Sequence, residues 1–204
     1  MRSEKEKMLA EGLYNPGDAE LVSIRKNARK LVREINQTHE DEYEKRATLV
    51  KQLFGGHKKA VYVEPPFHCD YGENITVGDN FYANFDCIML DVASITIGDN
   101  VMFGPRATLC TATHPIDAAV RNSDVELAKA IHIGNNVWFG ANVTVNPGVS
   151  IGDNVVVGSG AVVTKNIPSN VVAAGNPCKI LRDITSEERA YWQRQHQEYL
   201  EECK

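Results

Sequence analysis

The sequence predicts a parallel β-solenoid of six-residue repeats with helical segments at both ends. Two observations carry this prediction: a hexapeptide that recurs four times, and an apolar spacing that alternates between four and two residues. The four copies begin at positions 75, 95, 131 and 149 and read ITVGDN, ITIGDN, IHIGNN and VSIGDN. Their starts differ by 20, 36 and 18 residues, close to multiples of 18. A period of 18 indicates one three-sided coil made of three hexapeptides.

The apolar positions favour strands over helices. The first apolar position of each hexapeptide holds Ile133, Phe139, Val145, Ile151, Val157 and Val163. Four residues later stand Val137, Val143, Val149, Val155, Ala161 and Ile167. Every gap is even, as a strand requires if one face is to point inward, whereas a helix needs gaps of three and four. Gly-Asp-Asn and Gly-Asn-Asn fill the longer gap, and these residues tolerate the positive φ of tight turns.

Residues 1–57 are predicted to form an N-terminal helical cap. Apolar residues fall three or four apart at Leu21, Ile24, Ala28, Leu31, Val32 and Ile35, and Asp18 is the expected N-cap. A second stripe, from Tyr43 to Phe54, ends at two glycines, which are a helix stop. Such a cap can also wall a substrate pocket.

Residues 58–180 are predicted to form the β-helix, with one long excursion loop at about 111–130, where the hexad pattern stops. Long loops in regular scaffolds tend to carry function. Residues 181–204 are predicted to contain a C-terminal helix capped by Thr185 or Ser186. We expect this helix to lie over the open end of the last coil, where unpaired strand edges need cover.

The composition and net charge indicate in which cellular compartment the protein resides and which class of partner it binds. No apolar run approaches the ~18–20 residues of a membrane span, and the charged start MRSEKEKML does not resemble a signal peptide, so we expect a cytoplasmic protein with no membrane partner. The five cysteines lack a CxxC pair and read as buried hydrophobes. A net charge of −5 disfavours nucleic acid, which leaves small molecules as the expected partners.

His114 is the residue most suited to catalysis. It stands where the regular strands give way to the loop and is followed by a proline. An imidazole with an ordinary pKa of about 6.5 can accept a proton from a hydroxyl near neutral pH. A lone histidine at a loop root can also be structural. No second histidine follows within the next 17 residues, so we expect no metal site.

Several segments together resemble the maltose and galactoside O-acetyltransferases of the hexapeptide-repeat superfamily, most closely the maltose branch. The matching segments are Tyr71–Ile75, Asn80–Phe85, Thr113–Pro115, Ile133–Ala141, Asn146–Val149 and Val172–Ile180. The resemblance implies a left-handed parallel β-helix that assembles as a homotrimer, with active sites between subunits and coenzyme A along the groove between neighbouring prisms.

The resemblance also implies an acetyl-CoA-dependent acyltransferase with His114 as general base. Acetyl would pass directly from the thioester to a sugar hydroxyl through a tetrahedral intermediate, because a thioester is already activated. Asn84 and the backbone N–H of Ala141 match the positions that would stabilise the oxyanion. Asn84 and Asp70 would bind the sugar, with Tyr82 and Trp138 as apolar walls, although these two can equally be packing residues.

For coenzyme A, the resemblance implies a binding set that also includes Ala141. Its other members would be Ser159, Thr164, Lys165, Lys179 and Arg182, whose cationic side chains suit phosphates. Val92 and Pro16 stand where the galactoside enzyme carries acidic sugar-binding residues, which favours a maltose-like or glucose-like acceptor.

Two alternatives stay open. The same acetyl transfer could act on a non-sugar or xenobiotic acceptor, such as an antibiotic, a chito-oligosaccharide or an amino alcohol. A non-catalytic β-helix scaffold is the other, and it is disfavoured because His114, Asn84 and the cofactor-matching cations occur together.

Overall fold

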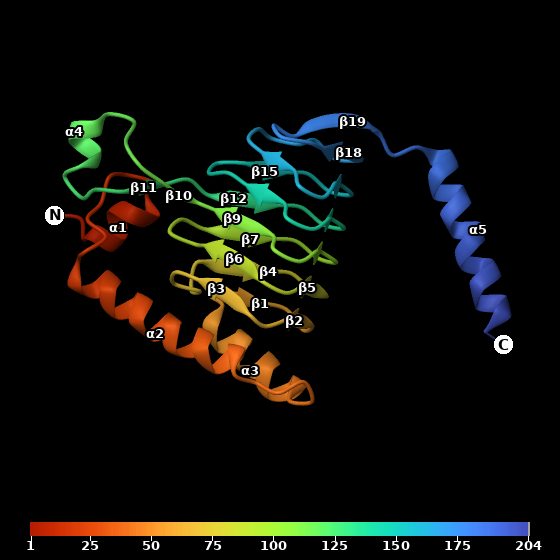
Figure 1. Cartoon of the computed structure of the whole chain (residues 1–204), viewed down its shortest axis with the longest axis horizontal. Coiled ribbons are helices and arrows are strands. Elements are labelled where there is room, and N and C mark those ends of the chain that lie inside the picture. The colour runs from red at the N-terminus through yellow and green to blue at the C-terminus, as the bar shows by residue number, and fades with distance from the viewer. Residues whose placement is uncertain (204) are drawn as a thin grey trace.

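The chain folds into a solenoid whose three sheets form the sides of a prism, with helices at both ends (Figure 1). The computed structural model describes residues 1–203. The first sheet contains β1 (Gly56–His57), β4 (Ile75–Val77), β7 (Ile95–Ile97), β12 (Ile131–Ile133) and β15 (Ser150–Ile151). The second contains β2 (Val61–Val63), β5 (Phe81–Ala83), β8 (Met102–Phe103), β13 (Trp138–Phe139), β16 (Val156–Val157), β18 (Val171–Ala174) and β19 (Lys179–Asp183). The third contains β3 (Phe67–Cys69), β6 (Cys87–Leu90), β9 (Thr108–Cys110), β14 (Thr144–Val145) and β17 (Val162–Val163).

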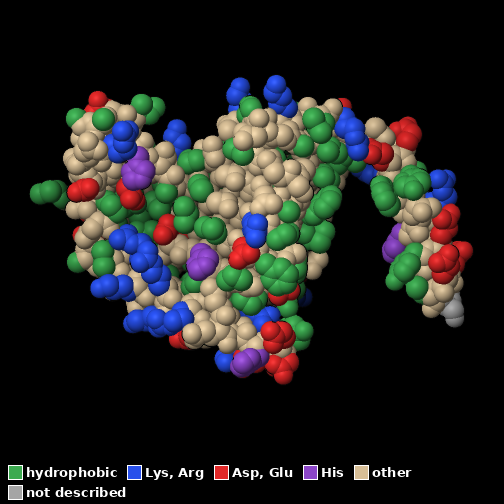
Figure 2. Space-filling model, viewed as in Figure 1, with side chains coloured by type: hydrophobic (Ala, Val, Ile, Leu, Met, Phe, Trp, Pro, Cys, Tyr) green, Lys and Arg blue, Asp and Glu red, His purple; other side chains and the backbone are tan. Residues whose placement is uncertain are grey.

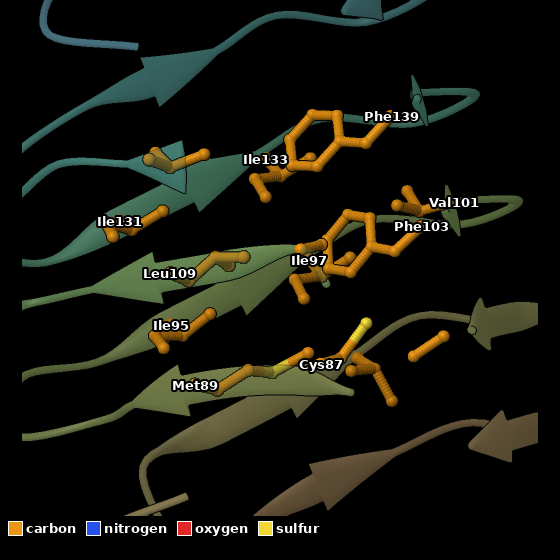
Figure 3. Close-up of a cluster of buried hydrophobic side chains, with 14 of the residues drawn as sticks. Cys87, Met89, Ile95, Ile97, Val101, Phe103, Leu109, Ile131, Ile133 and Phe139 are labelled. Atoms are coloured by element: carbon orange, nitrogen blue, oxygen red, sulfur yellow. The ribbon is translucent and has the colours of Figure 1, made fainter. Parts of the chain in front are cut away.

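Neighbouring strands within these sheets pair in parallel, except that β19 runs antiparallel to β18. The predicted interior is confirmed: the apolar positions from Ile133 to Ile167 are all buried. Figure 3 shows side chains from the three sheets pointing toward one another, among them Ile95, Leu109 and Phe139. The Phe103 and Phe139 rings stack with centroids 4.6 Å apart. Each coil therefore completes the core of its neighbours, as a solenoid requires.

The corners also form as predicted. Asn80, Asn100, Asn136 and Asn154, the last residues of the four hexapeptides, have φ between 54° and 58°. Their side chains form ladders along the solenoid, since the Asn80 amide donates to Asn100 at 3.1 Å and that of Asn100 donates to Asn136 at 3.2 Å. Asparagine thus supplies both the left-handed backbone conformation and a bond to the next coil.

Two helices, α2 (Ala19–Asn36) and α3 (Tyr43–Leu53), cover the first coil, whereas the short α1 (Glu4–Leu9) lies beside the excursion (Figure 1). The Asp18 carboxylate caps α2 as predicted, accepting from the N–H of Glu20 at 3.0 Å. Asn36 fixes the other end of α2 on β3, because its amide donates to the Phe67 carbonyl at 2.9 Å and accepts from the Phe67 N–H at 2.8 Å. α2 is therefore held at both ends as a wall beside the third sheet.

The excursion is ordered internally. β10 (Ala112–Thr113) and β11 (Leu127–Ala128) form a two-stranded antiparallel ribbon, and the short helix α4 (Ala118–Arg121) lies between them. The backbones of Tyr14 and Glu126 exchange N–H···O bonds of 3.0 and 3.1 Å. This bridge joins the N-terminal segment to the ribbon, so the two segments form one wall.

The expected placement of the C-terminal helix is wrong. α5 (Ser186–Glu202) begins at Thr185 with a capping box to Glu188, but it buries no residue and projects away from the solenoid (Figure 1). The last coil is covered instead by β19, which pairs with β18. No helix in the described part of the chain is long and apolar enough to cross a membrane.

Candidate active site

His114 directly follows β10, at the root of the ribbon that leaves the solenoid. Its side chain is exposed and borders a cavity of about 390 Å³, here called the inner cavity. The polar residues that line the inner cavity are Tyr14, Arg25, Arg29, Asp70, Tyr71, His114 and Glu126. Two carboxylates, two guanidiniums, two phenols and an imidazole thus surround one space. Such a concentration of hydrogen-bonding groups suits a small polar ligand.

Glu126 is held in the inner cavity by Tyr14. The Tyr14 hydroxyl donates to Glu126 Oε2 at 2.6 Å. Burial of the phenol, followed by this bond to the carboxylate, raises the pKa of Tyr14, so it remains a neutral donor. The second carboxylate oxygen of Glu126 has no hydrogen bond within the described chain, and it can accept from a ligand.

Arg25 braces the opposite side of the inner cavity. Its guanidinium donates to the Tyr71 hydroxyl at 2.6 Å and to the Pro16 carbonyl at 2.5 Å. Asp70, beside Tyr71, is partly buried, and that burial raises the pKa of its carboxyl, while Arg25 and Arg29 act in the opposite direction. The two arginines therefore favour the ionised form of Asp70, whereas its partial burial favours the neutral form.

Asp91 supports this wall from beneath and is fully buried. Its carboxylate accepts from the backbone N–H groups of Asp70 at 3.0 Å, Tyr71 at 2.9 Å and Asn74 at 3.3 Å. Burial raises the pKa of Asp91 to about 7, against the lowering effect of these N–H donors. The turn that presents Asp70 and Tyr71 thus depends on one buried carboxyl group.

The structure brings together only part of the predicted site. His114 and Asp70 share the inner cavity: Asp70 directly follows β3 of the third sheet, and His114 follows β10, the ribbon strand that comes after β9 of that sheet. Asn84 and Ala141 follow strands of the second sheet, at the corner that leads into the third. The strands of the third sheet therefore separate Asn84 and Ala141 from His114 within one chain.

Asn84 is oriented as a donor. Its Oδ1 accepts from the Phe85 N–H at 2.7 Å, which leaves the amide NH₂ group to donate elsewhere. The N–H of Ala141 donates to Ser159 Oγ at 3.0 Å, so this N–H can serve a ligand only if that bond opens. Tyr82 stacks on Tyr62 with ring centroids 5.8 Å apart, whereas Trp138 is half exposed on the same sheet.

The residues expected to meet coenzyme A lie along the last coils. Ser159 follows β16, Thr164 and Lys165 follow β17, and Lys179 and Arg182 belong to β19. Arg182 forms an ion pair with Glu188. Within residues 1–203, Lys165 and Lys179 form no ion pair, so their charges are available to an anion.

The chain matches two family models. The first, described as the maltose acetyltransferase hexapeptide capping motif, covers residues 7–58, and the second, described as the bacterial transferase hexapeptide (six repeats), covers residues 130–165. These two segments coincide with the helical cap and with the regular coils after the ribbon.

Three relatives are similar over most of the chain. The crystal structure of a maltose O-acetyltransferase from Clostridium difficile 630 is 53% identical, with a TM-score of 0.88, and covers 91% of this chain and 99% of its own. A galactoside acetyltransferase in complex with coenzyme A is 42% identical, with a TM-score of 0.89, covering 93% and 94%. The galactoside O-acetyltransferase of Escherichia coli is 42% identical over 172 residues, 84% of this chain and 85% of that protein.

Proposed function

The chain belongs to the maltose and galactoside acetyltransferase family of hexapeptide-repeat enzymes and is an acetyltransferase, and from this premise we propose that it acetylates a hydroxyl of a small maltose-like or glucose-like sugar, with His114 as general base. The observation that carries the proposal is the inner cavity, where His114 faces a set of hydroxyl-binding groups. Carboxylates such as Asp70 and Glu126 can each accept from sugar hydroxyls.

His114 moves the proton in the proposed reaction. As the sugar oxygen bonds to the carbonyl carbon of the acetyl thioester, the imidazole accepts the hydroxyl proton. The carbon–sulfur bond then breaks, and the imidazolium returns the proton to the departing sulfur. The cycle ends with an acetyl ester, a free thiol and a neutral His114, so no side-chain nucleophile is required.

Asn84 supplies the donor for the developing oxyanion in this proposal. Its NH₂ group is available to donate because Oδ1 already accepts from the Phe85 N–H. The Ala141 N–H is the second donor, released when Ser159 Oγ turns away. Preorganised donors of this kind stabilise charge that forms only in the transition state.

Because Asn84 and His114 occupy different corners of the prism, we propose that the site is completed between neighbouring copies in a homotrimer. An apolar row on the outer face of the second sheet supports association: Tyr82, Met102, Trp138 and Val156 stand in register on adjacent strands. Met102 and Trp138 are 52% and 50% exposed. An exposed apolar row of this kind is typical of a protein interface.

Coenzyme A is the proposed acyl carrier. The relative solved in complex with coenzyme A supports this assignment, as do the free cations at Lys165 and Lys179 near the last coils. Lysine ammonium groups bind phosphate as point charges. Arg182 would join them only by exchanging its ion pair with Glu188.

The acceptor is tested by thiol release from acetyl-CoA against a panel of glucose, maltose, galactosides, chito-oligosaccharides, amino alcohols and aminoglycosides. We expect the highest kcat/KM with maltose-like or glucose-like sugars. A higher value with a non-sugar would favour the alternative acceptor class, and no release with any member would contradict the proposal. Mass analysis of the ester identifies the acetylated molecule.

A further inference from the structure

α2 is basic although the chain as a whole is acidic. The helix carries five basic and two acidic residues, whereas the net charge of the chain is −5. Arg25, Arg29 and Arg33 follow one another at intervals of four, which places them along one side of the helix. Figure 2 shows lysine and arginine side chains gathered over this part of the molecule. The wall that α2 forms beside the third sheet therefore has a basic side.

A second cavity lies between α2 and the third sheet. It has a volume of about 550 Å³ and is here called the outer cavity. Its polar lining comes from Arg29, Arg33, Asn36, Gln37, His68 and Asp70. Arg29, Asp70 and Leu90 also line the inner cavity, so the two spaces adjoin. Together they offer more room than one sugar ring needs, since each alone falls in the usual range for a ligand site.

The two arginines of the outer cavity are not used by the fold. Arg25 is bonded to Tyr71 and Pro16, but Arg29 and Arg33 make no ion pair and no side-chain hydrogen bond to any residue that the structure describes. The two hydrogen bonds between the Asn36 side chain and the Phe67 backbone hold the end of α2 that carries Arg33 against β3. The guanidiniums thus project from a fixed wall with their donors available.

The charges of the two cavities differ. The inner cavity holds Asp70 and Glu126 against Arg25 and Arg29, which is balanced and suits neutral hydroxyls. The outer cavity holds Arg29 and Arg33 against Asp70 alone. Since Asp70 lies at the boundary near Arg29, Arg33 is the cation left without a counter-charge. A guanidinium presents paired donors that match a carboxylate or phosphate.

We propose that the outer cavity is a second acceptor subsite, which binds an anionic group on the part of the acceptor beyond the ring that carries the reacting hydroxyl. The acceptor class is then a glycoside with a carboxylate or phosphate about one sugar unit from the acetylated hydroxyl. This inference rests on the proposed function, because it places the reacting ring beside His114.

The test compares pairs of acceptors that share the glucosyl unit and differ in whether the second unit carries an anionic group. Maltobionate and maltitol share the glucosyl unit and differ by a carboxylate in place of a CH₂OH group; maltose 1-phosphate and methyl maltoside form the phosphate pair. We expect kcat/KM to be about tenfold or more higher for the charged member of at least one pair, as a charge-assisted hydrogen bond predicts. Comparison of the pairs distinguishes carboxylate from phosphate. Equal values in both pairs would overturn the inference.

Arg33→Gln is expected to bring the charged-to-neutral ratio close to one. Lys30→Gln is the matched control, since it removes the same charge from α2 but Lys30 does not line the outer cavity. If the charged-to-neutral ratio of kcat/KM stays high in Arg33→Gln, or falls as much in Lys30→Gln, Arg33 does not contact the anionic group and the inference is wrong. Calorimetric titration with maltobionate and maltitol gives a readout without turnover. If neutral sugars react without a charge preference, only this inference fails; if no acceptor reacts, the proposed function fails with it.

Discussion

The buried carboxyl group of Asp91 makes the stability of the fold depend on pH. Burial raises its pKa to about 7 in the folded chain, from the ordinary value of 3.8 for an aspartate. The pKa of Asp91 is higher in the folded chain than in the unfolded chain. Its contribution to the free energy of unfolding is therefore fully present below about pH 4 and is lost as the pH rises through about 7. A difference of about three pKa units corresponds to about 4 kcal/mol.

Asp91→Asn isolates this effect, since an amide does not titrate and still offers one oxygen to the Asp70 and Tyr71 N–H groups. The measurement is the free energy of unfolding in urea for both proteins at several pH values from 4.5 to 8.5. We expect the wild-type value to fall relative to the variant between pH 4.5 and about 7 and to stay level above pH 8. A difference that is constant, or that rises with pH, would mean that the backbone donors outweigh burial and keep the carboxylate ionised.

Two further predictions concern the acyl carrier and the core. The double variant Lys179→Ala, Arg182→Ala should raise the KM for acetyl-CoA more than the KM for the sugar in steady-state assays; the reverse order would mean that coenzyme A binds elsewhere. Phe139→Ala should lower the free energy of unfolding by about 3–5 kcal/mol, because it opens a cavity against the stacked Phe103 ring. A loss below about 1 kcal/mol in chemical denaturation would contradict a close-packed interior.

The solenoid is predictable because its sequence signal repeats. Each coil places apolar side chains on the same inner face, and each corner needs a residue that accepts positive φ, as Asn100 and Asn136 do. Neither requirement depends on a distant part of the chain. The same local logic makes Asp18 predictable as the cap of α2, because an N-cap depends only on the residues beside it.

What the repeat does not encode is contact between distant segments. Tyr14 and Glu126 are 112 residues apart, yet their bond builds one wall of the inner cavity. Asp91 falls in an ordinary position of the repeat, and only the folded turn at Asp70 and Tyr71 reveals its three backbone bonds. The placement of α5 was mispredicted because a capping box fixes where a helix begins and not which surface it covers.

The central claim is that His114 of one copy acts with Asn84 of a neighbour, and a mixing experiment tests it most directly. His114→Ala should reduce kcat by about 10²–10⁴ and Asn84→Ala by about 10²–10³, with coenzyme A binding retained in both. Co-expressed with different tags and isolated as mixed trimers, the two variants should recover activity, up to about a third of the wild-type value, because each mixed trimer has one interface of its three that pairs both intact residues. Mixed oligomers that stay as inactive as the separate variants, or a protein that proves monomeric, would contradict the account.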